Sequence, residues 1–401
     1  MADDDERWLI GPDAEPYLQE AAAATGDELA VITRLRKLLT AERARLIVEQ
    51  TTLRKRARTK FAYADRMFFT PLGLEQATDE VTANYKAARF PARQPVVDFC
   101  CGIGGDLLSL GQRGPTVGID RAPIAALRAA ANCQVHGSIY GEKFLATVEA
   151  SDVVPERVVE FAAWHIDPDR RPAGRRTTRT DLHEPSTETL DELLDANPRG
   201  AIKLAPAADL PISWSERCEA EWISRRGECK QLVAWFGELA QRPGERRATA
   251  VADDGTFRTF VGRGDLFVPS VERLGPYLFE PDAAVLAAEL TGAITQQYQI
   301  AAVHPGSVYL TGDAPFTDAL VHSWEVLEEM PFDLRRVRSW LTERGVGSIE
   351  LKKRGIDVDL EKLRRDLPLT GNAASDASVG LILVRRGDRV SAVFARRVVD
   401  L

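Results

Sequence analysis

A glycine-rich turn between two acids is the part of this sequence whose residues are best suited to chemistry. An apolar run containing Asp98 leads into Cys100-Cys101-Gly102-Ile103-Gly104-Gly105-Asp106, and a second apolar run ends at Asp120. Glycine adopts positive φ and lets a ligand approach the backbone closely. An acid at the end of the second strand can accept hydrogen bonds from ribose hydroxyls. The pattern predicts a nucleoside-cofactor site at the strand ends of an α/β sheet, with a structural turn that binds no ligand as the alternative.

The kind of cofactor follows from the charges beside the turn. Its glycines do not have the spacing that places a pyrophosphate on a helix N-terminus in dinucleotide-binding proteins. Two flanking carboxylates suit a cationic ligand instead, such as S-adenosylmethionine with its ammonium and sulfonium groups. We expect the cofactor contacts to come from Thr70, Asp98, Cys100, Gly102, Gly104, Gly105, Asp106, Asp120 and Asp152.

A second candidate motif, Asp167-Pro168-Asp169-Arg170-Arg171, follows the fourth expected strand. A carboxylate there can accept an N–H of a bound amine and remove its proton, and the two arginines can contact phosphate or stack on a base. The expected catalytic residues are Asp167, Pro168, Arg170 and Arg171. His165 and Trp164 precede the motif and are interpreted as residues packed on the strand.

The composition indicates where the protein is found and which kinds of site it lacks. The chain has 401 residues, 44% of them hydrophobic, and a net charge of −8. Its acidic start is unlike a signal peptide, and no apolar run reaches membrane-spanning length. Five cysteines without a paired framework predict a cytoplasmic protein, and five scattered histidines predict no metal site. The sequence assigns no oligomeric state.

Basic residues are concentrated in two segments of this acidic chain. Residues 34–66 contain eleven basic and three acidic residues, and residues 331–401 contain fifteen basic and ten acidic residues. Local basic patches on an acidic protein favour a polyanionic partner, with solvated helix faces as the alternative. The expected RNA contacts are Arg54, Lys55, Arg58, Lys352, Lys353 and Arg354.

The expected fold is α/β, with a Rossmann-like class I methyltransferase sheet, an N-terminal helical domain and a small C-terminal α+β domain. Helical spacing covers residues 13–90, and strands then alternate with helices, which is typical of a parallel sheet. The expected strands are 95–100, 116–120, 144–149, 159–166 and 200–205, followed by a hairpin over 218–236. We expect domains at 1–90, 91–275 and 333–401, with a helical connection at 276–332.

Several segments in this order resemble one family, the bacterial class I methyltransferases that carry a C-terminal THUMP-like domain. They are Leu53–Phe61, Leu74–Thr78, Asp98–Asp106, Asp167–Arg171, Ile202–Pro206, Glu219–Trp222, Tyr277–Pro281 and Ile349–Gly355. The catalytic core is also similar, more distantly, to trimethylguanosine synthases. The resemblance implies an S-adenosylmethionine-dependent enzyme, with the acceptor held after the fourth strand and RNA as its partner. This family usually has a small residue where Asp169 stands.

The expected function is therefore methylation of a base in RNA. A non-catalytic RNA-binding protein on a methyltransferase scaffold is one alternative, and a small-molecule or protein methyltransferase is another. The acids of the cofactor motif favour an enzyme, and the basic segments favour RNA.

Overall fold

The computed structural model describes the chain apart from residues 1, 25–27, 170–183, 370–378, 388 and 399–401. It divides into two compact units, which are described separately. The first is Met1–Ala220 with Gln231–Gly244 and Val251–Thr256, and the second is Glu221–Lys230, Glu245–Ala250 and Phe257–Leu401. Within the described ranges, no helix is both long and apolar enough to cross a membrane.

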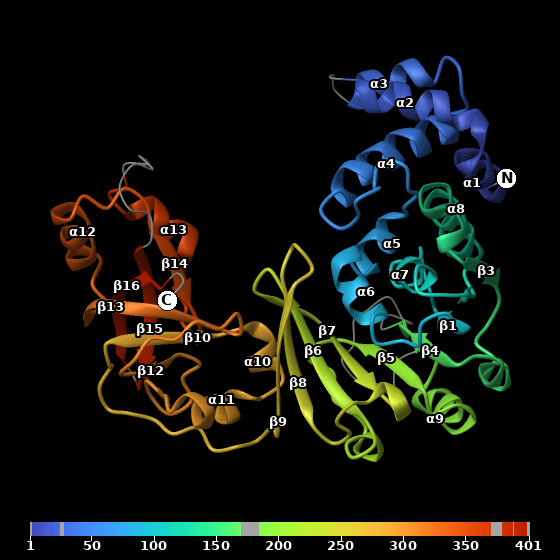
Figure 1. Cartoon of the computed structure of the whole chain (residues 1–401). Coiled ribbons are helices and arrows are strands. Elements are labelled where there is room, and N and C mark those ends of the chain that lie inside the picture. Colours follow the sequence, from blue (N-terminus) through green and yellow to red (C-terminus); the bar gives the residue numbers. More distant parts are fainter. Residues whose placement is uncertain (1, 25–27, 170–183, 370–378, 388, 399–401) are drawn as a thin grey trace. The chain divides into compact units, whose positions relative to one another are not determined.

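Six helices lie in the described part of residues 2–87, as its alanine- and leucine-rich pattern predicts (Figure 1). They are α1 (Ala2–Ile10), α2 (Glu15–Ala23), α3 (Glu28–Leu35), α4 (Ala41–Ala57), α5 (Pro71–Gln76) and α6 (Glu80–Ala87). Side-chain oxygens of Thr40, Thr70 and Asp79 cap α4, α5 and α6 by accepting a backbone N–H three residues on. Such caps satisfy N–H groups that the helix leaves unpaired.

A nine-stranded sheet follows, in the order β3-β2-β1-β4-β5-β7-β6-β8-β9. Its parallel part is β1 (Val96–Phe99), β2 (Thr116–Asp120), β3 (Ala146–Ala150), β4 (Ala163–Ile166) and β5 (Gly200–Leu204). The helices between these strands are α7 (Leu107–Gly111), α8 (Pro123–Tyr140) and α9 (Thr187–Ala196). The order changes direction between β1 and β4, and ligands of open α/β sheets bind at such a point, outside the carboxyl ends of the strands.

Antiparallel strands complete this sheet. β7 (Glu228–Trp235) pairs antiparallel with β5, and β6 (Glu219–Arg225), β8 (Arg246–Val251) and β9 (Phe257–Gly262) follow in the strand order. Short 3₁₀ helices lie at Pro12–Ala14, Gly141–Lys143, Pro155–Glu160, Ile212–Trp214 and Gly237–Leu239.

The second unit contains a seven-stranded sheet in the order β11-β12-β10-β13-β16-β15-β14. The strands are β10 (Tyr277–Pro281), β11 (Ala301–Ala302), β12 (Leu310–Gly312), β13 (Val321–Pro331), β14 (Glu350–Lys353), β15 (Val379–Arg386) and β16 (Arg389–Arg397). Its helices are α10 (Ala283–Ala287), α11 (Thr291–Tyr298), α12 (Leu334–Glu343) and α13 (Leu360–Asp366). Leu381 and Leu383 of β15 join the core of α12 and α13, whereas Ile382 and Val384 join a second core. Alternate residues of a strand point to opposite faces, so this sheet is apolar on both faces.

Two expected elements differ from the structure. β4 begins at Ala163, because residues Pro155–Glu160 form a 3₁₀ helix. The expected connection at 276–332 instead contributes β10, β12 and β13 to the second sheet. Tyr277–Pro281 pairs with strands on both sides, and Pro281 is its last residue. Helix α10 begins at Ala283, after the cap Asp282.

Candidate functional site

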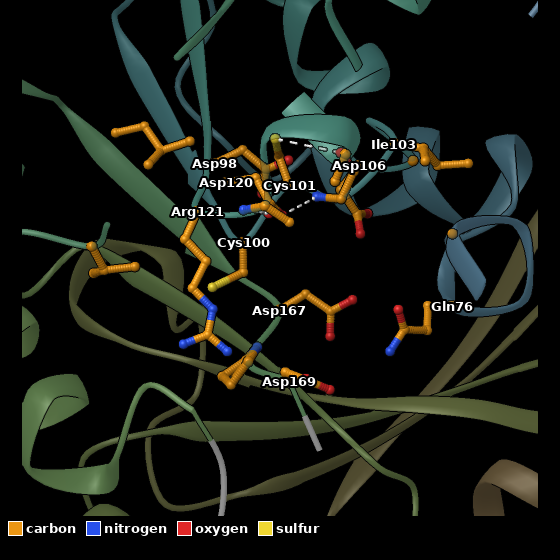
Figure 2. Close-up of a pocket in the computed structure, with 18 of the residues that line it drawn as sticks. Gln76, Asp98, Cys100, Cys101, Ile103, Asp106, Asp120, Arg121, Asp167 and Asp169 are labelled. Carbon is orange, nitrogen blue, oxygen red and sulfur yellow. Dashed lines mark hydrogen bonds between the residues drawn. The ribbon is translucent and has the colours of Figure 1, made fainter. Parts of the chain in front are cut away.

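A cavity of about 680 Å³ opens at the carboxyl ends of the parallel strands in the first unit. Figure 2 shows the turn after β1 and the acids that follow β2 and β4 around this space. The segment 70–78, which contains α5, lines the same cavity. A volume of this size is in the range of pockets that hold cofactors or drug-sized ligands.

The turn after β1 has the backbone geometry that its glycines predict. Gly102 and Gly104 have φ of 57° and 95°, and Cys100 also has a positive φ of 53°. A Cβ on Gly102 would meet no atom within 4 Å, whereas one on Gly105 would lie 2.9 Å from the backbone nitrogen of Thr78. Gly102 therefore keeps the backbone exposed to the cavity, and Gly105 allows close packing against the segment that ends α5.

Asp120 at the end of β2 is fixed by two backbone groups. Its Oδ2 accepts the N–H of Gly102 at 2.8 Å, and its Oδ1 accepts the N–H of Ala122 at 2.9 Å. Each carboxylate oxygen can accept a further hydrogen bond. The acid is thus oriented beside the glycine turn and can still bind a ligand.

Eight of the nine expected cofactor residues line this cavity; they are Thr70, Asp98, Cys100, Gly102, Gly105, Asp106, Asp120 and Asp152. Gly104 does not line the cavity. Its positive φ shapes the turn. Of the expected catalytic residues, Asp167 and Pro168 line the cavity, and Arg170 and Arg171 lie outside the described residues.

Buried charged side chains form a network of contacts beside the cavity. Asp106 accepts a hydrogen bond from the Thr78 hydroxyl at 2.7 Å, and its Oδ1 lies 2.7 Å from Nζ of Lys86 on α6. Lys203 on β5 places its Nζ 2.5 Å from Asp167 Oδ2 and 3.9 Å from Asp106 Oδ2. One buried ammonium thus connects the acid beside the turn to the acid after β4.

Asp98 and His165 face each other on the neighbouring strands β1 and β4. His165 Nδ1 lies 2.6 Å from Asp98 Oδ1, and its Nε2 lies 4.0 Å from Asp106 Oδ2. Both side chains are 1% exposed and line the cavity. His165 is thus buried on its strand, as expected, and it also holds the first acid of the motif.

The environment shifts the protonation of these groups. Burial raises the pKa of Asp106, but Lys86, His165 and Lys203 outweigh it and hold that pKa well below its usual value. Burial lowers the pKa of Lys86, against the opposing charge of Asp106. Burial raises the pKa of Asp98, and the charge of His165 only partly offsets it.

The residues around the cavity fit a cationic nucleoside cofactor. Among the described atoms, the buried Oδ2 of Asp98 has no hydrogen-bond partner, so it can accept one from a ligand. Asp120 offers carboxylate oxygens to ribose hydroxyls, and the space at Gly102 admits a ligand next to the backbone. Two acids and an exposed stretch of turn backbone thus line one cavity.

On the other side of the cavity, acids surround the end of β4. The carboxylates of Asp167 and Asp169 and the amide of Gln76 face the same space in Figure 2. Glu184 pairs with Asp169 through two backbone hydrogen bonds, and its carboxylate binds the guanidinium of Arg121. This side can accept hydrogen bonds from a nitrogen-bearing ligand.

Sequence reasoning assigned no role to Lys86, Lys203, Thr78 or Gln76. Thr78 and Gln76 lie in the segment Leu74–Thr78, and Lys203 lies in Ile202–Pro206, both of which carry the family resemblance. The resemblance of these two segments to the family is therefore the sequence signal that could have identified Thr78, Gln76 and Lys203. Lys86 has no such signal, because an isolated lysine on a helix usually faces solvent.

The expected RNA contact at Arg54 is wrong. The Arg54 side chain is buried, its Nε donates to the carbonyl of Met67 at 2.9 Å, and its guanidinium stacks on Phe68. It holds the loop that leads to α5, so it cannot reach a backbone phosphate. Lys55 and Arg58 are exposed, and Arg58 pairs with Asp65 at 2.9 Å.

The C-terminal basic group is also less available than expected. Lys352 lies 2.7 Å from Glu280 and 3.2 Å from Glu350, and its side chain is 20% exposed. The carboxylates of Glu280 and Glu350 neutralise the charge of Lys352 within the sheet. Lys353 is half-buried and Arg354 is exposed. These two remain candidates for contact with a polyanion.

Comparison with known proteins identifies the family. Residues 321–397 match the model of the THUMP domain-like family. An uncharacterized S-adenosylmethionine-dependent methyltransferase of Mycobacterium tuberculosis, present in strains CDC 1551 and H37Rv, is 31% identical over 343 residues, which is 82% of this chain and 91% of the relative.

The fold has a match in a solved structure. The crystal structure of a protein assigned as a methyltransferase from Porphyromonas gingivalis W83 aligns with 99% of this chain and 98% of its own, with a TM-score of 0.72 and 18% identity. The likeness extends over both units and shows the fold. Given the sequence relative and this fold, the chain belongs to the class I S-adenosylmethionine-dependent methyltransferases that carry a THUMP-like domain.

Proposed function

We propose that this enzyme methylates a base in RNA, with the acceptor bound at Asp167. The observation that carries the proposal is the position of Asp167 in the cavity. It is 24% exposed, lies beyond the end of β4, and shares the cavity with the glycine turn and Asp120. Acceptor and cofactor would therefore meet in one enclosed space.

The cofactor side is assigned from the contacts above. Asp120 binds the ribose hydroxyls, and the turn from Gly102 to Gly105 holds the amino acid portion. Asp152, after β3, lies near the adenine edge, and Thr70 contacts the methionine end. When bound, S-adenosylmethionine would supply a methyl group on a sulfonium; a well-placed nucleophile bonds to that methyl carbon while the methyl–sulfur bond breaks and the neutral thioether leaves.

On the acceptor side, the enzyme has to orient a nucleophile and accept its proton. Lys203 holds Oδ2 of Asp167, so Oδ1 is the oxygen that can accept an N–H from the acceptor. Asp169 lines the same cavity and would repel a phosphate. The surroundings of Asp167 therefore favour a nitrogen on a base over a backbone oxygen.

An RNA partner is supported by the second unit. True THUMP domains bind RNA, and residues 321–397 match a THUMP-like family. Exposed or half-buried basic residues remain at Lys55, Arg58, Lys353 and Arg354. Basic side chains of this kind neutralise backbone phosphates without reading sequence.

Mass spectrometry of RNA nucleosides tests the proposal. A strain lacking the gene should lose one methylated nucleoside, and a plasmid copy of the gene should restore it. A copy with Asp167→Asn should not restore it, although the protein is present at the same level. An unchanged nucleoside profile in the deletion strain would refute RNA as the substrate and leave a small-molecule or protein acceptor.

A further inference from the structure

The Asp98–His165 pair contains two buried polar atoms, and the proposed transfer assigns no role to the one on His165. In the described part of the chain, neither Oδ2 of Asp98 nor Nε2 of His165 has a hydrogen-bond partner. Both residues are 1% exposed, and both line the cofactor cavity. Buried polar atoms without partners are uncommon, and they point to a ligand or to a change of protonation.

The ring of His165 lies between two carboxylates. One ring nitrogen faces Asp98 at 2.6 Å and the other faces Asp106 at 4.0 Å. An imidazolium donates from both nitrogens, whereas a neutral ring presents a lone pair from one of them. Of the two carboxylates, only that of Asp98 is within hydrogen-bond distance of the ring.

The net charge of the surrounding cluster determines whether a bound cation would displace a proton from the pair. Asp106 at the start of α7 and Lys86 on α6 interact with the pair, and Lys203 on β5 and Asp167 beyond β4 extend the same cluster from Asp106. With a proton shared by Asp98 and His165, three carboxylates balance two ammonium groups and one imidazolium. Without that proton, the cluster carries one net negative charge.

We propose that the Asp98–His165 pair senses the charge of the cofactor: it holds a proton in the free enzyme and releases that proton to solvent when S-adenosylmethionine binds. This inference rests on the proposed placement of the cofactor in the cavity. The ammonium and carboxylate of the cofactor cancel, so its sulfonium leaves one positive charge in a site with little water. That charge replaces the proton and restores neutrality in the cluster.

S-adenosylhomocysteine, the product, has no sulfonium charge and should leave the proton in place. The pair therefore distinguishes cofactor from product by charge. Because cofactor binding releases a proton, S-adenosylmethionine should bind more tightly as the pH rises, by up to about tenfold per pH unit while the pair still holds its proton. Product affinity should be nearly independent of pH in the same range, so product inhibition should be strongest at low pH.

Isothermal titration calorimetry in buffers of different ionisation enthalpy counts the protons directly. For the wild-type enzyme below neutral pH, the slope of observed enthalpy against buffer enthalpy should correspond to release of about one proton per S-adenosylmethionine and close to none per S-adenosylhomocysteine. Sinefungin, in which a protonated amine replaces the sulfonium, should behave like the cofactor. Equal proton counts for cofactor and product would overturn the inference, and this test needs no variant.

Two variants assign the proton to the pair. His165→Asn keeps a donor near Asp98, and Asp98→Asn removes the charge of its partner; each should abolish the release and leave the affinity for product measurable. His136→Asn is the matched control, because His136 is also buried but packs against Tyr63 and Phe144 outside the cavity. Proton release that persists in both pair variants would refute the assignment.

A separate variant tests the placement of the cofactor, so that a wrong placement can be distinguished from a wrong charge-sensing inference. Gly102→Val puts a side chain into open space of the cavity and should block both ligands. If Gly102→Val binds both ligands normally, the proposed placement fails. If it blocks them while the wild-type enzyme releases no proton, the placement stands and the charge-sensing inference fails.

Discussion

Replacing Lys86 by Met should destabilise the first unit strongly, because it removes one member of a buried ion pair. Lys86 Nζ and Asp106 Oδ1 are 2.7 Å apart, and their side chains are 2% and 9% exposed. Breaking a buried pair by removing one partner costs about 3–5 kcal/mol, since the other charge stays buried without compensation. Thr78 and Lys203 still contact Asp106, so we expect a loss near the lower limit, about 3 kcal/mol.

The stability lost in Lys86→Met should also depend on pH, in a direction set by the pKa of Asp106. The folded-state pKa of Asp106 lies below its unfolded value, so the pair contributes stability above the unfolded pKa and loses it as the pH falls toward the folded pKa. In Lys86→Met the carboxyl can neutralise itself by binding a proton. The difference in stability between wild type and variant should therefore be greatest near neutral pH and shrink in acid.

Native-state hydrogen exchange of peptides covering β1 and β4 measures this loss in the first unit alone. Arg58→Met is the matched control, because its pair with Asp65 is exposed on both sides and should contribute little. The double variant Lys86→Met with Asp106→Asn should lose less than the two single variants combined. A loss no larger than that of Arg58→Met, or one that does not change between neutral and acidic pH, would refute the reasoning.

Four further predictions follow from the site and the basic segments. Asp120→Asn should weaken S-adenosylmethionine binding by about 1.5–3 kcal/mol in calorimetry, and undiminished affinity would exclude Asp120 as the ribose ligand. Asp167→Asn should bind the cofactor nearly normally but lose turnover in single-turnover assays, whereas weak binding with normal turnover would reverse its role. Arg54→Met should lower the melting temperature and leave the RNA affinity of the folded protein unchanged. Alanine at both Lys353 and Arg354 should flatten the salt dependence of RNA binding by roughly 0.7 per lost phosphate contact in filter-binding assays, and an unchanged slope would count against these contacts.

The parallel sheet and the cofactor turn were predictable from sequence because local patterns determine them. The turn needs glycines at positive φ, and Asp120 ends an apolar strand, so spacing alone predicted that both lie at the strand ends of the sheet.

The buried charges were not predictable, because they depend on contacts between distant segments. Nothing local distinguishes Lys86, which is buried against Asp106, from a lysine in solvent. For Arg54 the error is the reverse. Its position in a basic run predicted contact with RNA, but its side chain is buried and donates to the carbonyl of Met67. Similarly, strand β10 was mistaken for part of a connection, because its partners β12 and β13 follow later in the chain.

Transfer of a labelled methyl group in vitro tests the central claim most directly. Purified enzyme with labelled S-adenosylmethionine should methylate RNA extracted from a strain that lacks the gene, and should label RNA from the parent strain much less, because its sites are already occupied. Asp167→Asn should transfer no label to either RNA. Equal labelling by wild type and Asp167→Asn, or label found only in protein or small molecules, would contradict the account.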